Sequence, residues 1–195
     1  DDVKVIESVG DWHDRGLPKT VYSMLQNTAT RHGARKAISF QLLSGPKDRA
    51  ETLTWEELRG KTAQAANLFR SLGVEKDDVV AYLLPNANET VIALLGGMVA
   101  GITNQIKPLL DADQIAAILR ETNAKVLVTL KAFPKTDVPQ KAAEAVKLAP
   151  NVKSALVVDL NRYLTPPQSW IVPLLRPKTP VSQQARVLSF YAEAA

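Results

Sequence analysis

The chain has 195 residues, of which 46% are hydrophobic and 23% charged, a length and balance typical of one globular α/β domain with a buried core. It contains no cysteine, which excludes disulfides, thiolate metal sites and cysteine nucleophiles. The net charge of +4 comes mostly from residues 161–195 and forms no basic stripe with interleaved aromatic residues, so the sequence disfavours nucleic-acid binding.

The first elements along the chain are a helix and a hairpin. Residues 17–32 place Val21, Leu25 and Ala29 at helical spacing, and Gly33 follows as a C′ residue that we expect to end the helix. Two short β-prone runs come next, residues 36–43 and 51–55, separated by a turn at Gly45-Pro46. We therefore predict an N-terminal extension with a helix over residues 1–35 and then a β-hairpin.

A second helix begins at Thr54, where threonine followed by Glu57 three residues later forms a capping box. Its apolar positions lie on one face, and Gly73 marks its end. These buried positions are Leu58, Thr62, Ala65 or Ala66, Phe69 and Leu72. Trp55 is expected to anchor the hairpin against this helix.

Strands and helices then alternate. Residues 78–85, 124–130 and 153–160 are apolar runs of strand length, of the kind buried on both faces of a parallel sheet. Helical patterns at residues 88–101, 111–123 and 138–150 connect them, and Gly96-Gly97 is expected to permit close packing of a neighbour. The fold class predicted is α/β, a mostly parallel doubly wound sheet with flanking helices, preceded by a β-hairpin.

Proline dominates the chain after residue 160, with Pro166, Pro167, Pro173, Pro177 and Pro180 in a short stretch. Such spacing disfavours regular helix and central strand. We therefore predict three parts: the extension at 1–35, an α/β subdomain at 36–160, and a proline-rich loop with a short terminal helix at 161–195.

Recognisable catalytic motifs are missing from the sequence. Neither the dinucleotide motif G-x-G-x-x-G nor a P-loop occurs, no glycine follows Gly101, and neither H-E-x-x-H nor G-x-S-x-G is present. His13 and His32 are 19 positions apart, and the lone Lys107 beside Pro108 is expected to be solvated. Three acidic groups fall at helix starts or turns, where capping is favoured over acid–base catalysis: Glu56-Glu57, Asp77-Asp78 and Asp111 with Asp113. The sequence therefore assigns no catalytic, cofactor-binding or metal-binding residue.

The chain nevertheless resembles one protein family over roughly residues 35–160. The helix start "TWEEL", the run "GVEKDDVV" leading to a strand that ends "LPN", the apolar helix ending "AGI", and "KVLVT" occur in the order found in the N-terminal part of AMP-forming acyl-CoA synthetases. These belong to the adenylate-forming superfamily with luciferases and adenylation domains. One departure is Ile106-Lys107-Pro108, where the family commonly has asparagine before the proline.

The resemblance implies a ligase that activates a carboxylate as acyl-AMP with ATP and Mg²⁺ and transfers it to CoA. The family's Ser/Thr/Gly-rich phosphate loop, its ATP-holding acidic and arginine residues and its catalytic lysine have no counterpart here. The sequence is therefore interpreted as an incomplete N-terminal subdomain of a larger enzyme, inactive alone, with no cofactor of its own.

Two alternatives stay open, a stand-alone α/β binding module that uses the proline-rich tail for docking, and a small hydrolase or oxidoreductase, which the missing motifs disfavour. No secretory signal is visible and the longest charge-free run, residues 90–106, is shorter than the roughly 20 residues that span a bilayer. We expect a cytoplasmic protein without a transmembrane segment, and the sequence leaves homo-oligomerisation and the acyl substrate open.

Overall fold

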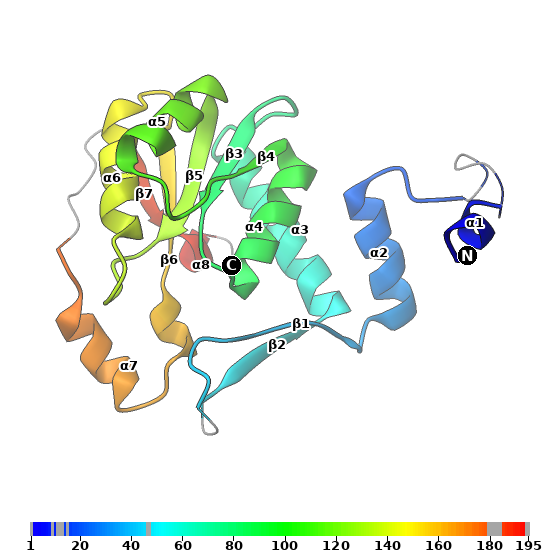
Figure 1. Cartoon of the computed structure of the whole chain (residues 1–195), viewed down its shortest axis with the longest axis horizontal. Coiled ribbons are helices and arrows are strands. Elements are labelled where there is room, and N and C mark those ends of the chain that lie inside the picture. Colours follow the sequence, from blue (N-terminus) through cyan, green and yellow to red (C-terminus); the bar gives the residue numbers. More distant parts are fainter. Residues whose placement is uncertain are drawn as a thin grey trace.

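A parallel sheet forms the centre of the structure (Figure 1). The computed structural model describes residues 2–8, 10, 14, 16–45, 48–178 and 185–193. The five described strands of the sheet lie in the order β4-β3-β5-β6-β7, and every neighbouring pair is parallel. Their bounds are β3 Val79–Leu83, β4 Ile102–Gln105, β5 Ala124–Leu130, β6 Ser154–Val158 and β7 Arg186–Ser189. The predicted fold class is confirmed.

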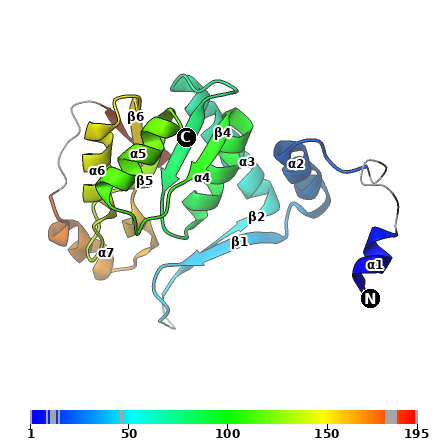
Figure 2. The same cartoon turned by 45° about the horizontal axis from the view of Figure 1, so that its top comes forward.

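Two pairs of helices cover the two faces of this sheet (Figures 1 and 2). Helices α3 (Trp55–Ser71) and α4 (Asn88–Ala100) pack together on one face, and α5 (Ala112–Glu121) and α6 (Val138–Leu148) on the other. All of β3 and nearly all of β5 are buried, as their continuous apolar runs predict.

The strand order reverses once along the chain. The connection through α4 takes the chain from β3 to β4 on one side, whereas α5 and α6 take it to β5 and β6 on the other side. The loops after β3 and β5 therefore diverge, which makes the carboxyl ends of these two strands the topological switch point where open α/β sheets bind ligands.

The predicted hairpin precedes the sheet. Strands β1 (Lys36–Gln41) and β2 (Ala50–Thr54) pair antiparallel. At the end of β2, Thr54 caps α3, and the Glu57 carboxylate accepts hydrogen bonds from the Thr54 amide at 2.8 Å and from its hydroxyl at 2.9 Å. The capping box is thus confirmed, and Trp55 packs against the core at this corner.

The helices before the hairpin are α1 (Asp2–Glu7) and α2 (Val21–His32). A second capping box, between Thr20 and Ser23, starts α2. Helix α2 ends at His32 with Gly33 as its C-cap residue, as expected, although Gly33 has a right-handed φ of −47° and not the left-handed conformation common for such a glycine. Gly73, by contrast, has φ +86° and fulfils that role after α3.

The sequence missed two strands. Strand β4 (sequence ITNQ) lies at the sheet edge with half-exposed residues and carries no apolar run to mark it. Strand β7 lies where a loop and a short helix were expected, because its only signal is Val187 and Leu188 after a proline-rich stretch. The described part of that stretch forms short turns: η2 (Leu160–Tyr163), α7 (Gln168–Ile171), η3 (Val172–Leu175) and, after β7, α8 (Phe190–Glu193).

The three-part division at residues 35 and 160 stays a prediction. Among the described residues, no helix combines the length and apolar character needed to cross a membrane.

Glycines in and after α4 allow close packing, as predicted. A Cβ on Gly96 would lie 2.7 Å from the Ala65 Cβ of α3, which explains how the two helices approach each other. Gly101 is more constrained, because a Cβ there would lie 2.5 Å from the Asp78 carbonyl oxygen and 2.7 Å from that of Glu75. Backbone atoms cannot rotate away, so this position admits only glycine.

We predict that Gly101→Ala lowers the free energy of unfolding by about 1–3 kcal/mol, the usual cost of overpacking. Gly60→Ala is the matched control, since Gly60 lies inside α3 and a Cβ there meets no atom within 4 Å. It should leave stability unchanged or raise it by about 0.5–1 kcal/mol, because alanine favours helix. Urea unfolding of both variants measures the difference, and equal stability would contradict the packing argument.

Candidate functional site at the carboxyl edge of the sheet

A cavity of about 870 Å³ lies at the carboxyl ends of the strands. Its walls come from the segments that follow β3, β4, β5 and β6, with one residue from the hairpin and part of α6. The lining residues are Leu42, Pro85, Pro108, Leu109, Leu130, Phe133, Pro134, Lys135, Thr136, Asp137, Val138, Gln140, Leu160 and Pro177. The cavity therefore occupies the switch point that the strand order defines.

The lining is mainly apolar, with a few polar groups on one side. Leucines, prolines and Phe133 supply most of the wall, whereas Lys135, Thr136, Asp137 and Gln140 come from the β5–α6 connection and the first turn of α6. The Gln140 Oε1 atom is buried without a hydrogen-bond partner among the described residues. An apolar cavity with few polar groups suits a ligand with an apolar body and a polar end.

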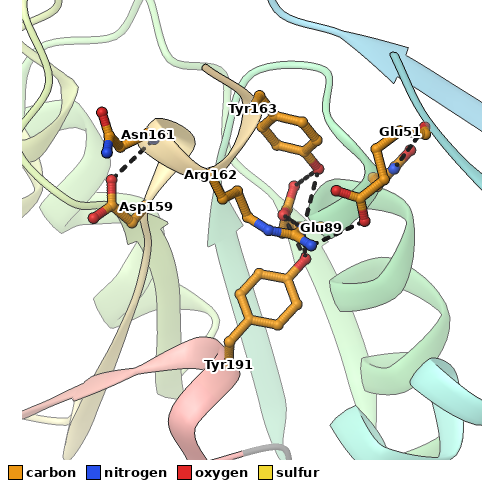
Figure 3. Close-up of polar contacts among 8 residues, drawn as sticks. Glu51, Glu89, Asp159, Asn161, Arg162, Tyr163 and Tyr191 are labelled. Carbon is orange, nitrogen blue, oxygen red and sulfur yellow. Dashed lines mark hydrogen bonds and ion pairs between the residues drawn. The ribbon is translucent and has the colours of Figure 1, made fainter. Parts of the chain in front are cut away.

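Beside this edge, a buried carboxylate holds four segments together (Figure 3). Glu89, in the first turn of α4, is fully buried. Its carboxylate accepts hydrogen bonds from the hydroxyl of Tyr163 at 2.7 Å and of Tyr191 at 2.5 Å, and from Arg162 Nη1 at 2.7 Å. These partners belong to η2 and α8, far from Glu89 in the sequence.

Arg162 extends this network to the hairpin. Its Nη2 donates to the Glu51 carboxylate of β2 at 2.9 Å, while the Asn88 side-chain amide donates to the Glu51 carbonyl at 3.2 Å. The guanidinium also lies over the Tyr191 ring, 4.2 Å from its centroid. A buried charge is costly unless it is paired and hydrogen-bonded, and here every partner is supplied by the fold.

The network shifts the titration of its members. Burial and then the negative charge of Glu89 raise the pKa of both Tyr163 and Tyr191. Burial alone would lower the pKa of Arg162, but the hydrogen bond to Glu89 raises it above its ordinary value. The tyrosines therefore stay neutral donors and Arg162 stays a cation, which is a structural arrangement rather than one that transfers protons.

A second ion cluster lies at the end of β6. Arg176 Nη2 donates to both oxygens of Asp159, at 2.6 and 2.8 Å, and Lys131 Nζ lies 3.4 Å from Asp159 Oδ2. Burial alone raises the pKa of Asp159, but hydrogen bonds from Arg176 and from the Asn161 amide hold it below its ordinary value. The three side chains together carry one net positive charge.

The acidic groups considered in the sequence serve helix starts and turns, as expected. Asp78 accepts from the Glu75 amide at 2.7 Å and from Lys125 Nζ at 2.6 Å, and the Lys125 hydrogen bond is the main cause of its lowered pKa. Glu57 completes the cap of α3, Glu56 pairs with Arg59, and Asp111 is the N-cap residue of α5.

The sequence analysis also considered Lys107 and the two histidines, His13 and His32. Lys107 and His32 are exposed, whereas His13 falls outside the described residues. The part of the chain that the structure describes contains no group of three or more His, Cys, Asp or Glu placed to hold a metal. That no residue of this chain is catalytic stays a prediction.

The sequence analysis did not find the Glu89 network, although one signal for it exists. Glu89 is the only charged residue between Asp78 and Lys107. A lone carboxylate at the start of a helix that is apolar almost all round requires a buried partner. The identity of that partner could not be read, because Arg162 lies 73 positions away and only the fold brings it near.

A family model described as "AMP-binding enzyme" matches residues 25–186, which include the hairpin, strands β3 to β6 and the whole network apart from Tyr191. The chain belongs to the AMP-binding enzyme family. This confirms the resemblance seen in the sequence.

Individual members of the AMP-binding family are similar over large parts of the chain. A marinolic acid–CoA ligase from Pseudoalteromonas sp. (strain SANK 73390) is 34% identical over 124 residues, which cover 64% of this chain and 19% of that protein. A long-chain-fatty-acid–CoA ligase from Bacillus subtilis (strain 168) is 31% identical over 165 residues, covering 83% of this chain and 27% of that protein. The chain thus spans between 19% and 27% of the length of these relatives.

Solved structures share the fold. Acetoacetyl-CoA synthetase from Streptomyces lividans matches 89% of this chain and 24% of its own with a TM-score of 0.67 at 21% identity. The anthranilate CoA ligase AuaEII in complex with anthranoyl-AMP matches 91% of this chain and 31% of its own with a TM-score of 0.62, also at 21% identity. At this identity the likeness supports the arrangement of strands and helices alone.

We predict that Glu89→Gln lowers the free energy of unfolding by about 1–3 kcal/mol, because a neutral amide leaves Arg162 and two tyrosine hydroxyls with a poorer acceptor. Glu56→Gln, at the exposed Glu56–Arg59 pair, is the control and should change stability little. Chemical denaturation followed by circular dichroism measures both. Equal losses of unfolding free energy in the two variants would show that the buried Glu89 contributes no more to stability than an exposed carboxylate.

The raised tyrosine pKa values predict a loss of stability in alkali. Because the folded-state values of Tyr163 and Tyr191 lie above the unfolded value of about 10, their contribution is fully present below that pH and is lost as pH rises above it. Unfolding free energies measured between neutral pH and pH about 11 should fall above about 10, and less steeply in the double variant Tyr163→Phe/Tyr191→Phe. An equally steep fall of the unfolding free energy with pH in the two proteins would contradict the assignment of this loss to Tyr163 and Tyr191.

Proposed function

We propose that this chain is the N-terminal subdomain of an AMP-forming acyl-CoA synthetase. The enzyme would activate a carboxylate with ATP as acyl-AMP, releasing pyrophosphate, and transfer the acyl group to the thiol of CoA. The single observation that carries the proposal is the family match over residues 25–186. The CoA ligases among the relatives, and the apolar cavity at the switch point, agree with a carboxylic acid substrate that has an apolar body.

The contribution of this chain is a wall of the substrate cleft. Pro85, Pro108 and Phe133 present an apolar surface at the carboxyl edge, and the Glu89 network fixes the hairpin beside it. A ligand lying there would be shielded from water by these side chains, which strengthens electrostatic interactions at its reacting end.

The reacting groups themselves would come from other parts of the longer protein. Charge develops on the α-phosphate of ATP during attack by the carboxylate, and its stabilisation requires backbone amides, cations or basic side chains aimed at that position. Among the described residues, the cavity lining contains no glycine and Asp137 as its one acidic side chain, which does not make a Mg²⁺ site. The described residues therefore do not fit the metal.

Cytoplasmic location is part of the same proposal and is compatible with a chain that lacks cysteine.

The test is carboxylate-dependent exchange of pyrophosphate into ATP. We expect no exchange by residues 1–195 alone and measurable exchange by the longer polypeptide that contains them, with a panel of aliphatic and aromatic acids as substrates. Exchange by residues 1–195 alone would overturn the proposal that the reacting groups lie outside these residues. Absence of exchange by the longer polypeptide with every acid would instead favour a binding module.

A further inference from the structure

Large apolar side chains lie exposed on two consecutive helical turns after β6. Helix α7 (Gln168–Ile171) runs directly into η3 (Val172–Leu175). The exposed fractions of the side chains there are 70% for Trp170, 46% for Ile171, 84% for Leu174 and 63% for Leu175. We call these four residues the α7 patch. None of them belongs to the described core or to the apolar residues packed against it. Such a gathering of exposed apolar side chains indicates an interaction surface.

The α7 patch has the sequence spacing of a single helix face. Its residues stand at positions i, i+1, i+4 and i+5, a spacing that usually marks the side of a helix facing the core. Here that side is exposed instead, and Figures 1 and 2 show α7 at the outside of the molecule, beyond the end of the sheet. The pattern of a buried helix therefore occurs on turns that the described part of the chain leaves uncovered.

Hydrogen bonds fix these turns at both ends. The Asn161 side-chain amide donates to the Ser169 carbonyl at 3.1 Å, directly before Trp170. After the patch, Arg176 Nη2 donates to both oxygens of Asp159 at 2.6 and 2.8 Å, and the Arg176 side chain is only 15% exposed. Polar contacts to the segment that follows β6 thus hold the apolar patch outward.

The charges around the α7 patch are positive. Residues 163–175 carry no charge, and residues 160–192 contain no Asp or Glu. Lys178, three positions after the patch, is exposed. The ion cluster around Asp159, which holds the end of η3, carries one net positive charge. The patch therefore combines an apolar centre with a basic flank.

We propose that the α7 patch binds the surface of a membrane that carries anionic lipid headgroups. Trp and Leu side chains enter the boundary between headgroups and acyl chains, and basic residues beside them attract anionic headgroups. The two turns hold far fewer than the about 20 residues that cross a bilayer, so the contact stays at the surface.

A bilayer fits this patch better than a protein partner does. A projecting apolar tip needs a matching pocket in a protein, because anchor side chains contribute to affinity where they are packed and desolvated. A fluid bilayer accommodates the tip without a preformed pocket. The proposal goes beyond the ligase reaction and does not depend on it.

The same contact would keep the switch-point cavity close to the membrane. Leu160 and Pro177 both line that cavity. The segment that carries the patch, residues 161–176, therefore begins and ends at the cavity wall.

Vesicle co-sedimentation tests the proposal without any measurement of activity. Binding of the longer polypeptide and of residues 1–195 is measured with vesicles of phosphatidylcholine alone and of phosphatidylcholine and phosphatidylglycerol in equal parts. The test variant is Trp170→Ala/Leu174→Ala. The matched control is Met24→Ala/Met98→Ala, because these side chains are exposed to 51% and 46% on α2 and α4, away from the patch. Circular dichroism checks that each variant is folded.

We expect both proteins to bind the anionic vesicles about tenfold more tightly than phosphatidylcholine alone, since each basic residue near an anionic surface favours binding by about fivefold. Trp170→Ala/Leu174→Ala should weaken binding about tenfold or more, because large apolar side chains no longer leave water, and the control should change it little. Absence of binding to anionic vesicles, or equal losses in the two variants, would overturn the proposal. Binding by residues 1–195 but not by the longer polypeptide would also overturn it, since another part of that polypeptide would then cover the patch.

Tryptophan fluorescence gives a second measurement at the patch itself. The chain contains Trp12, Trp55 and Trp170. Anionic vesicles should shift the emission to shorter wavelength, and Trp170→Phe should keep the binding but lose this shift. A shift that persists in Trp170→Phe would contradict insertion of the patch.

A second copy of the chain is the other occupant that these experiments detect. Self-association without vesicles that Trp170→Ala/Leu174→Ala abolishes would contradict the proposal, because the patch would then join two copies. Neither ATP nor CoA takes part, so failure here is distinguishable from failure of the exchange assay.

Discussion

The buried carboxylate of Glu89 is the constraint on which the arrangement around the sheet edge depends. Its burial would be prohibitive without compensation, because the desolvation of a lone carboxylate costs several kcal/mol in real proteins. Compensation comes from Arg162, Tyr163 and Tyr191, and through Arg162 also from Glu51. The hairpin, α4, η2 and α8 are therefore joined in one network, since each supplies a member of it.

The Glu89 network supports the cavity without lining it. The network pairs its own donors and acceptors beside the cavity, which helps the cavity wall to keep its shape. The carboxyl edge of an open α/β sheet is the usual place for ligands, yet the loops there are built from proline, leucine and phenylalanine instead of glycine. Such a wall can bind an apolar body and exclude water, and under the proposed function phosphate recognition falls to other segments.

Most of the scaffold could be predicted from the sequence because its signals are local. The capping box at Thr54, the apolar runs of β3 and β5, and the small residues Gly96 and Gly97 act within a few positions of one another or through burial alone. What could not be predicted depends on distant partners. Strand β4 is held by pairing with β3 and has no apolar pattern of its own, and the partners of Glu89 lie 73 to 102 positions away. At Gly33 the helix end could be predicted, whereas the hydrogen bond that its carbonyl accepts from the Glu56 amide of α3 could not, because it joins residues 23 positions apart.

The two faces of the sheet are covered unequally by helices, because each helix covers only the strands near which the chain path places it. On the α3–α4 face, α4 contacts β3 and β4, α8 contacts β6 and β7, and the Phe190 side chain of α8 lies beside that of Phe69. On the α6 face, cover runs out at β7 because the proline-rich stretch cannot form the long helix that a crossover requires. A half-exposed valine in a parallel strand is unusual, since such sheets are normally covered on both faces.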